Sequence, residues 1–118
     1  MSQLTGLRIY LAIMDSAQAT IDIEPDRIYF ALTTDDTMDS GSVSSDTRLM
    51  EAAAATLTRK PERGLPADTV MKVAFDYSDG SRRKAESAEF GADNLNSLIS
   101  TLCRHSEHLE FLSGFAVR

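Results

Sequence analysis

The chain has 118 residues, of which 42% are hydrophobic and 25% charged, and its formal net charge is −6. This length fits a single domain over residues 1–118 with a core of its own. The composition excludes collagen, a wholly disordered chain and a disulfide scaffold. No apolar run approaches the roughly 18 residues of a membrane-spanning helix. The negative charge argues against direct binding to the phosphates of a nucleic acid.

The cysteine content points to a reducing compartment. Cys103 is the single cysteine of the sequence, so no internal disulfide forms. Ala17-Gln18-Ala19 is similar to a signal-peptide cleavage site, but the apolar run before it, residues 9–14, is short and Asp15 interrupts it. We therefore expect a cytoplasmic protein without a membrane partner.

Two hydrophobic patterns overlap in the first segment, residues 4–17. Helical spacing is seen at Leu4, Leu7, Leu11 and Met14. The alternation of a strand is seen at Leu7, Ile9, Leu11 and Ile13. The length of the segment favours a helix of about three turns over a strand.

A β-hairpin is predicted next, followed by a loop. The β-branched and aromatic runs 19–23 and 27–32 flank Glu24-Pro25-Asp26, and proline and aspartate both favour a turn. Residues 33–47 contain only two sizeable apolar side chains, Met38 and Val43. So little apolar surface predicts a flexible acidic loop at about 33–46.

Two helices are predicted in the remainder of the chain. One runs from about Asp46 to Arg59, with Ser44, Ser45 or Asp46 as its cap. The other begins at a cap on Asp93 and runs to Leu112, with Gly114 as its stop. Its apolar stripe consists of Leu95, Leu98, Ile99, Leu102, Leu109 and Leu112.

The second hairpin, residues 69–90, allows its register to be predicted. A two-residue Asp79-Gly80 loop would put Lys84 and Glu86 on the apolar face. A three-residue loop, with Gly80 in the left-handed conformation, avoids this. It pairs Val73 with Ala85, Phe75 with Arg83, Asp76 with Arg82 and Lys72 with Glu86. We expect an α+β fold: two antiparallel β-hairpins forming one sheet, packed by about three helices on one face.

Metal-binding and catalytic patterns are weak. His105 and His108 share one face of the predicted helix, but Cys103 points elsewhere, and structural zinc needs about four such ligands. We interpret His105 as a partly buried, hydrogen-bonded side chain on the apolar stripe, and Cys103 as a small buried residue. No phosphate-binding loop or nucleophile elbow is present. We expect no metal, no cofactor and no catalytic residue.

The acidic residues are concentrated in one part of the sequence. Residues 15–46 hold eight acids and one base, Arg27, so this window carries −7 and the rest of the chain +1. Electrostatic complementarity to a basic protein is one function of such a surface. Immunity proteins against basic toxins, and phage inhibitors that mimic nucleic acid with carboxylates, resemble this chain in size and charge. The predicted contact residues are Asp22, Glu24, Asp26, Asp35, Asp36 and Asp39.

Two alternatives stay open beside this non-catalytic binding module. One is a self-associating structural or accessory subunit, a homodimer for example, that uses Phe111, Leu112 and Phe115 at the end of the C-terminal helix. The other is a small enzyme of unrecognised type, since a fold class does not exclude catalysis.

Overall fold

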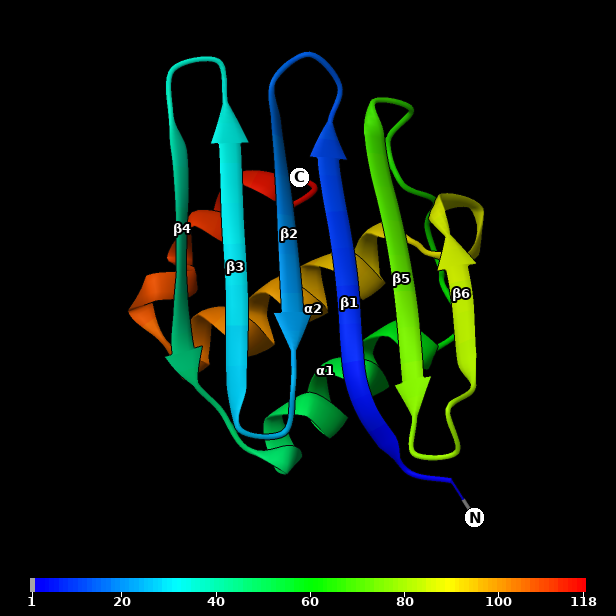
Figure 1. The fold of residues 1–118 in the computed structure, drawn as a ribbon. Coiled ribbons are helices and arrows are strands. Elements are labelled where there is room, and N and C mark those ends of the chain that lie inside the picture. The colour runs from blue at the N-terminus through cyan, green and yellow to red at the C-terminus, as the bar shows by residue number, and fades with distance from the viewer. Residues whose placement is uncertain (1) are drawn as a thin grey trace.

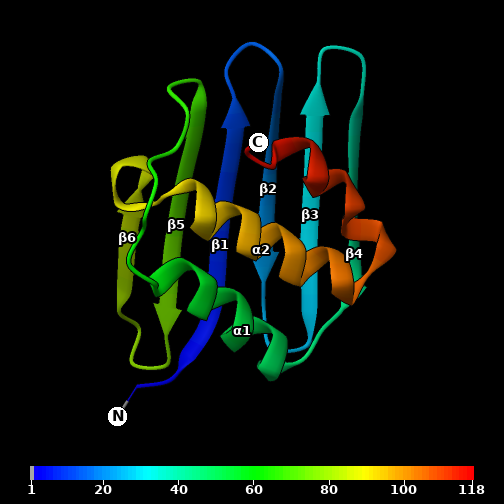
Figure 2. The same cartoon turned by 180° about the vertical axis from the view of Figure 1, so that it is seen from behind.

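The computed structural model describes residues 2–118 and contains one antiparallel sheet of six strands, in the order β4-β3-β2-β1-β5-β6 (Figure 1). The strands are β1 (Leu4–Ile13), β2 (Ala17–Ile23), β3 (Arg27–Thr34), β4 (Met38–Ser44), β5 (Thr69–Tyr77) and β6 (Arg82–Glu86). The helical elements are α1 (Thr47–Thr58), α2 (Ala92–His105) and the 3-10 segments η1 (Ser87–Glu89) and η2 (Glu107–Phe115). α1, α2 and η2 cover one face of the sheet, as Figure 2 shows, which confirms the predicted α+β architecture.

The segment predicted as the first helix is strand β1, so that prediction was wrong. β1 lies inside the sheet between β2 and β5. The strand alternation therefore decides the structure: Leu7, Ile9 and Leu11 are buried under the helices. The helical spacing of the apolar residues does not produce a helix here. The backbone N–H and C=O groups of β1 are instead hydrogen-bonded to β2 on one side and to β5 on the other.

The structure also corrects the flexible loop predicted at 33–46. Only residues 35–37 form a turn there, and Met38–Ser44 pair with β3 as the edge strand β4. Val43 is the one apolar residue of β4 that packs partly against the core. The backbone ladder to β3 holds this strand with little side-chain burial, which is why its composition resembles that of a loop.

The hairpin β5–β6 has the predicted register. Val73 pairs with Ala85, and Lys72 with Glu86. Gly80 adopts a positive φ of 86°, the left-handed conformation that the three-residue loop requires. The guanidinium of Arg83 lies 5.0 Å from the ring centroid of Phe75, so a cation–π contact accommodates this charge on the apolar face.

The helix ends differ in part from those predicted. Asp46 caps α1, as expected, by accepting a hydrogen bond from the Leu49 N–H at 2.8 Å. Asp93 does not cap α2; its carboxylate accepts from the Glu62 N–H at 3.2 Å. The predicted C-terminal helix is also interrupted at Ser106, and the chain continues as η2.

The two faces of the sheet differ in character. The helix-covered face holds the core, and it includes Leu112 and Phe115. These two side chains are therefore not available for the self-association that the sequence suggested. The opposite face carries no helix, and its side chains are mostly polar or small, such as Arg8, Thr20 and Ala74. Within residues 2–118, no helix has the length and apolar character needed to cross a membrane.

Candidate partner-binding surface

The six acidic residues predicted as one contact surface lie in three separate places. Asp22, Glu24 and Asp26 lie on β2 and in the β2–β3 turn, whereas Asp35 and Asp36 lie in the turn after β3. The eight residues of β3 separate these two groups by about 25 Å. Asp39 lies on β4, opposite Leu32 and therefore on the helix-covered side of the sheet. The antiparallel meander thus separates residues that are close in sequence.

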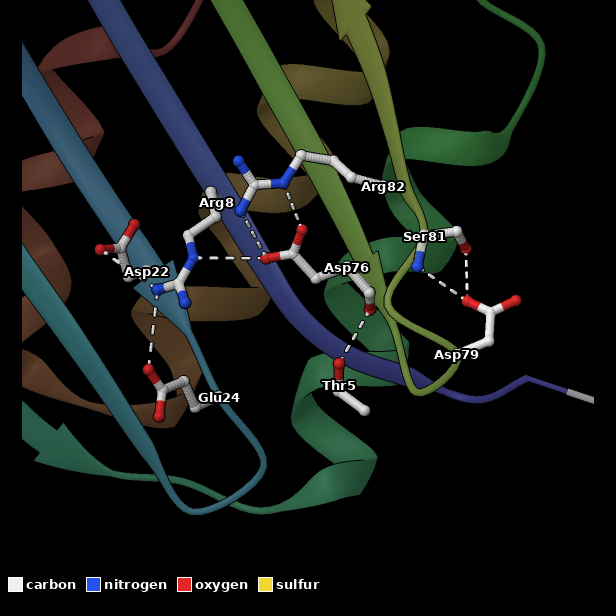
Figure 3. A network of polar contacts seen from close by, with 8 residues as sticks. All are labelled: Thr5, Arg8, Asp22, Glu24, Asp76, Asp79, Ser81 and Arg82. Carbon is white, nitrogen blue, oxygen red and sulfur yellow. Dashed lines mark hydrogen bonds and ion pairs between the residues drawn. The ribbon is translucent and has the colours of Figure 1, made fainter.

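Asp22 and Glu24 are engaged within the protein itself. Arg8 Nη1 lies 3.4 Å from Asp22 Oδ2 and 3.6 Å from Glu24 Oε2 (Figure 3). Arg8 Nε is also 3.5 Å from Asp76 Oδ2 on the neighbouring strand. The guanidinium at the centre of this network reduces, without cancelling, the negative charge of the three carboxylates around it. Asp22 and Glu24 therefore offer a partner less free charge than two unpaired acids would.

Asp76 is the point at which the network extends to β6. Its carboxylate accepts hydrogen bonds from Arg82, and this interaction holds the pKa of Asp76 below its ordinary value. Burial acts in the opposite direction and raises the pKa, while the positive charges of Arg82 and Arg8 lower it further. The network thus joins β2, β1, β5 and β6 across the uncovered face, and we assign it a structural role.

Free negative charge gathers at the opposite end of the sheet, where three chain segments meet. These are the β1–β2 turn (residues 14–16), the β3–β4 turn (residues 35–37) and the approach to β5 (residues 66–68), and Figure 1 shows them together at the top. The Met14 N–H donates to the Asp68 carbonyl at 2.9 Å and links the first to the third. We call this group the acidic end. Its four carboxylates are Asp15, Asp35, Asp36 and Asp68, and its segments contain no Lys or Arg.

A hollow of about 370 Å³ lies between the β1–β2 turn and the β3–β4 turn, on the uncovered face of the sheet. Ala12 and Val70 contribute to its lining together with the ring of Tyr10, and Asp15 and Asp35 lie at the turns that border it. The Tyr10 hydroxyl donates to Gln18 Oε1 at 3.0 Å, which orients the ring. An aromatic face beside carboxylates is suited to a cationic side chain, through cation–π attraction and charge pairing.

Sequence reasoning missed half of the acidic end. Asp15 belongs to the acidic window but was not among the predicted contact residues, and Asp68 lies outside the window. Asp15 and Asp68 can be recognised as part of this surface only from the strand topology and not from the local sequence. Asp15 follows an alternating run, Leu7 to Ile13, and Asp68 precedes another, so both mark the ends of strands. Pairing β1 with β5 brings these ends together.

The metal-ligand candidates near the C terminus do not assemble into a site. Among residues 2–118, no cluster of three or more His, Cys, Asp or Glu side chains could hold a metal ion. His105 is exposed rather than partly buried, and its Nε2 lies 2.7 Å from the Ser44 carbonyl oxygen, so only the hydrogen bond agrees with the expectation. Burial raises the pKa of the Cys103 thiol, and the charge of Glu110 raises it further. A protonated thiol is a poor nucleophile.

No protein-family model matches this chain, and no curated protein matches its sequence.

Proposed function

We propose that the protein is a non-catalytic protein-binding module of the inhibitor or immunity type, which docks its acidic end on a basic surface of a larger partner. The observation that carries this proposal is the convergence of Asp15, Asp35, Asp36 and Asp68 at one end of the sheet, in segments without a basic residue. Such a surface steers a basic partner during diffusion and disfavours acidic ones.

The hollow between the turns supplies a specific contact within this surface. A lysine or arginine side chain of the partner enters beside Tyr10, and its charge meets Asp15 and Asp35. Met14, with 59% of its surface exposed, borders the hollow and adds apolar contact for the aliphatic part of that side chain. Charge then provides attraction at long range, and the hollow provides orientation at contact.

The positions of the acidic residues favour one class of inhibitor, a compact acidic patch, over a mimic of nucleic acid. A mimic of nucleic acid needs carboxylates that follow a phosphate path, but Asp22 and Glu24 are paired with Arg8 and lie far from Asp35 and Asp36. We therefore propose a compact patch that meets a few basic side chains, rather than an extended imitation of a phosphate backbone.

Affinity capture from the native host lysate at low salt, followed by mass spectrometry, tests the proposal. The Asp35→Asn/Asp36→Asn variant removes two charges from the acidic end. The matched control, Asp22→Asn/Glu24→Gln, removes two charges from the arginine network. We expect wild type and control to retain the same basic partner, the acidic-end variant to bind it roughly tenfold more weakly, and moderate salt to release it.

Three outcomes would count against the docking proposal. A partner retained equally by both variants and insensitive to salt would show that the acidic end is not the contact. Equal loss from both variants would indicate an effect of net charge alone. Recovery of the protein with only copies of itself would favour a self-associating subunit.

A further inference from the structure

The two edges of the sheet differ in how well they are protected against further pairing. Strand β6 begins Arg82-Arg83-Lys84, and consecutive charges on an edge strand discourage the addition of another strand. Strand β4, with the sequence MDSGSVS, contains one charged residue, Asp39, and neither lysine nor proline. No strand pairs with its outer side, although η2 extends past β4 on the helix-covered side of the sheet in Figure 1 and Figure 2. β4 is therefore the edge at which an added strand meets least resistance.

The register of β3 and β4 shows which backbone groups point outward. The Ser45 N–H donates to the Asp26 carbonyl at 3.0 Å, and the Thr34 N–H donates to the Thr37 carbonyl at 2.9 Å. Hydrogen-bonded pairs alternate along an antiparallel ladder, so Asp39, Gly41 and Val43 bond inward to β3. The N–H and C=O groups of Met38, Ser40 and Ser42 consequently face away from the sheet.

His105 marks one end of this free edge. Its Nε2 lies 2.7 Å from the carbonyl oxygen of Ser44, which is the next outward-facing group in the series. The contact occupies that acceptor and places an imidazole ring beside the last residue of β4. The stretch open to pairing is therefore Met38 to Ser42.

A second hollow, of about 410 Å³, lies on the helix-covered side between β4 and η2. Gly41 leaves it open, since a Cβ at that position would lie 2.8 Å from Phe30 Cζ. The ring of Phe30 packs near that of Phe111, with centroids 5.4 Å apart. The hollow is lined by Phe30, Leu32, Phe111, Asp39, Glu107 and His108. It thus combines an apolar floor with two carboxylates.

We infer that β4 binds an extended, basic segment of the partner as an additional antiparallel strand, with a lysine or arginine opposite Gly41 placed in the hollow between β4 and η2. This inference rests on the proposed function and specifies how the partner is held. The segment's backbone pairs with Ser40 and Ser42, because their polar groups face outward. The cationic side chain lays its aliphatic stem on Phe30 and Phe111 and directs its charge to Asp39 and Glu107.

Charge also distinguishes this occupant from a second copy of the chain. A two-fold pairing of β4 with β4 about Gly41 would bring together two edges that each carry Asp39 and, from η2, Glu107. Like charges brought together at an interface oppose its formation. A basic segment meets the same groups with the opposite charge.

The test uses the full chain and the peptide acetyl-Thr-Lys-Thr-Lys-Thr-Lys-Thr-amide, which presents threonines on one face of a strand and lysines on the other. A second peptide has the same sequence and charge but carries N-methyl groups on the threonines, which remove backbone donors. Binding is followed through the backbone amide signals in NMR spectra. We expect the first peptide to shift the signals of Met38, Ser40, Ser42 and Phe111, and the methylated peptide to bind at least about tenfold more weakly.

Two variants test the edge directly. Ser40→Pro removes an outward N–H without breaking a bond to β3, and should weaken binding of the first peptide by about tenfold. Lys84→Pro makes the same change on the other edge strand, β6. The Tyr77 N–H donates to the Ser81 carbonyl, and the alternation of hydrogen-bonded pairs from there makes the backbone N–H of Lys84 face away from β5. This variant should leave binding unchanged. The methylated peptide keeps the test decisive if Ser40→Pro fails to fold.

Several results would overturn strand addition. Equal binding of both peptides, with shifts at Asp15, Asp35 and Asp36, would leave the acidic end as the contact and remove β4 from it. Shifts of the β6 amide signals in place of the β4 signals would show that the peptide adds to the opposite edge of the sheet. Absence of any binding at low salt would count against both the strand and the basic partner. A wild-type dimer that Ser40→Pro converts to a monomer would assign the edge to a second copy.

Discussion

The side-chain amide of Asn94 donates to the carbonyl oxygen of Thr56 at 2.9 Å, which joins the start of α2 to the end of α1. The same nitrogen donates to the Arg59 carbonyl at 3.0 Å, and the side-chain oxygen accepts from the Gly91 N–H at 2.8 Å. Asn94 is only 1% exposed. Backbone groups at two helix ends, which have no partners within their own helices, are satisfied by this one residue.

Replacing this amide should destabilise the fold strongly. Asn94→Ala leaves the Thr56 and Arg59 carbonyls without this donor and the Gly91 N–H without its acceptor, and we expect the free energy of unfolding to fall by about 3 kcal/mol. Urea denaturation followed by circular dichroism measures the change. Ser100→Ala, on the exposed side of the same helix, is the control and should change stability by under about 0.5 kcal/mol. Similar losses in both variants would contradict the bridging role.

The cap of α1 provides a milder test. Asp46 Oδ1 accepts from the Leu49 N–H, so Asp46→Ala should lower the free energy of unfolding by about 1 kcal/mol. Asn offers the same acceptor, and Asp46→Asn should keep most of the stability. Paired urea titrations of the two variants separate capping from charge. If the Asn variant lost as much as the Ala variant, charge at the helix start would be the dominant effect.

Gly41 and Phe30 should behave as a coupled pair. A Cβ on residue 41 would lie 2.8 Å from Phe30 Cζ, so Gly41→Ala forces the ring to move and should cost about 1–2 kcal/mol of stability. In a Phe30→Leu background the same change should cost clearly less, because the ring atom that it meets is absent. A double-mutant cycle from thermal or urea unfolding measures this coupling. Strictly additive effects would show that another contact excludes a side chain at this position.

The Asp76 network should make stability depend on acid pH. The pKa of Asp76 in the folded protein is held below its ordinary value, chiefly by the hydrogen bond from Arg82. The folded state therefore favours the charged carboxylate, so this stabilisation is complete above the unfolded-state pKa of about 4 and is lost as the pH falls through the folded value.

Unfolding measured between about pH 5 and pH 2 tests this dependence. Wild type should lose stability on acidification, and Asp76→Asn, which has no carboxylate to protonate there, should lose less. Arg82→Gln removes the charged guanidinium that donates to Asp76 and should also flatten the dependence. A variant Asp76→Asn with the full wild-type slope would assign the acid sensitivity to other carboxylates.

Local sequence chemistry was sufficient for the β5–β6 hairpin but not for β1. In the hairpin, opposite charges and the turn glycine favoured one register, and Lys72 pairs with Glu86 as predicted. In β1, helical and strand patterns share Leu7 and Leu11, and only the partners on either side decide between them. β4 was missed because its stability comes from backbone pairing with β3, which leaves almost no hydrophobic pattern in the sequence.

The candidate site was less predictable, because it depends on which strand ends meet. Asp26 and Asp35 belong to the same acidic window of the sequence, but strand β3 lies between them and places them at opposite ends of the sheet. The same window does not include Asp68, which joins Asp15 only because the first and fifth strands pair. The charge of the sequence suggested the basic partner that we propose, whereas the location of the acidic end depends on the topology.

The place of β1 within the sheet also affects how the protein is made. β1 lies between β2, the next strand in the chain, and β5, whose first residue, Thr69, is separated from the last residue of β1, Ile13, by α1 and three strands. During synthesis the N-terminal strands emerge first and can pair as a meander, while one edge of β1 has no neighbour until residue 77 has left the ribosome. Closing that long-range pair is the entropically costly step of folding. The nascent chain is thus most exposed to misassociation at its most apolar strand, Leu4–Ile13, and not at the edge that stays open in the finished protein.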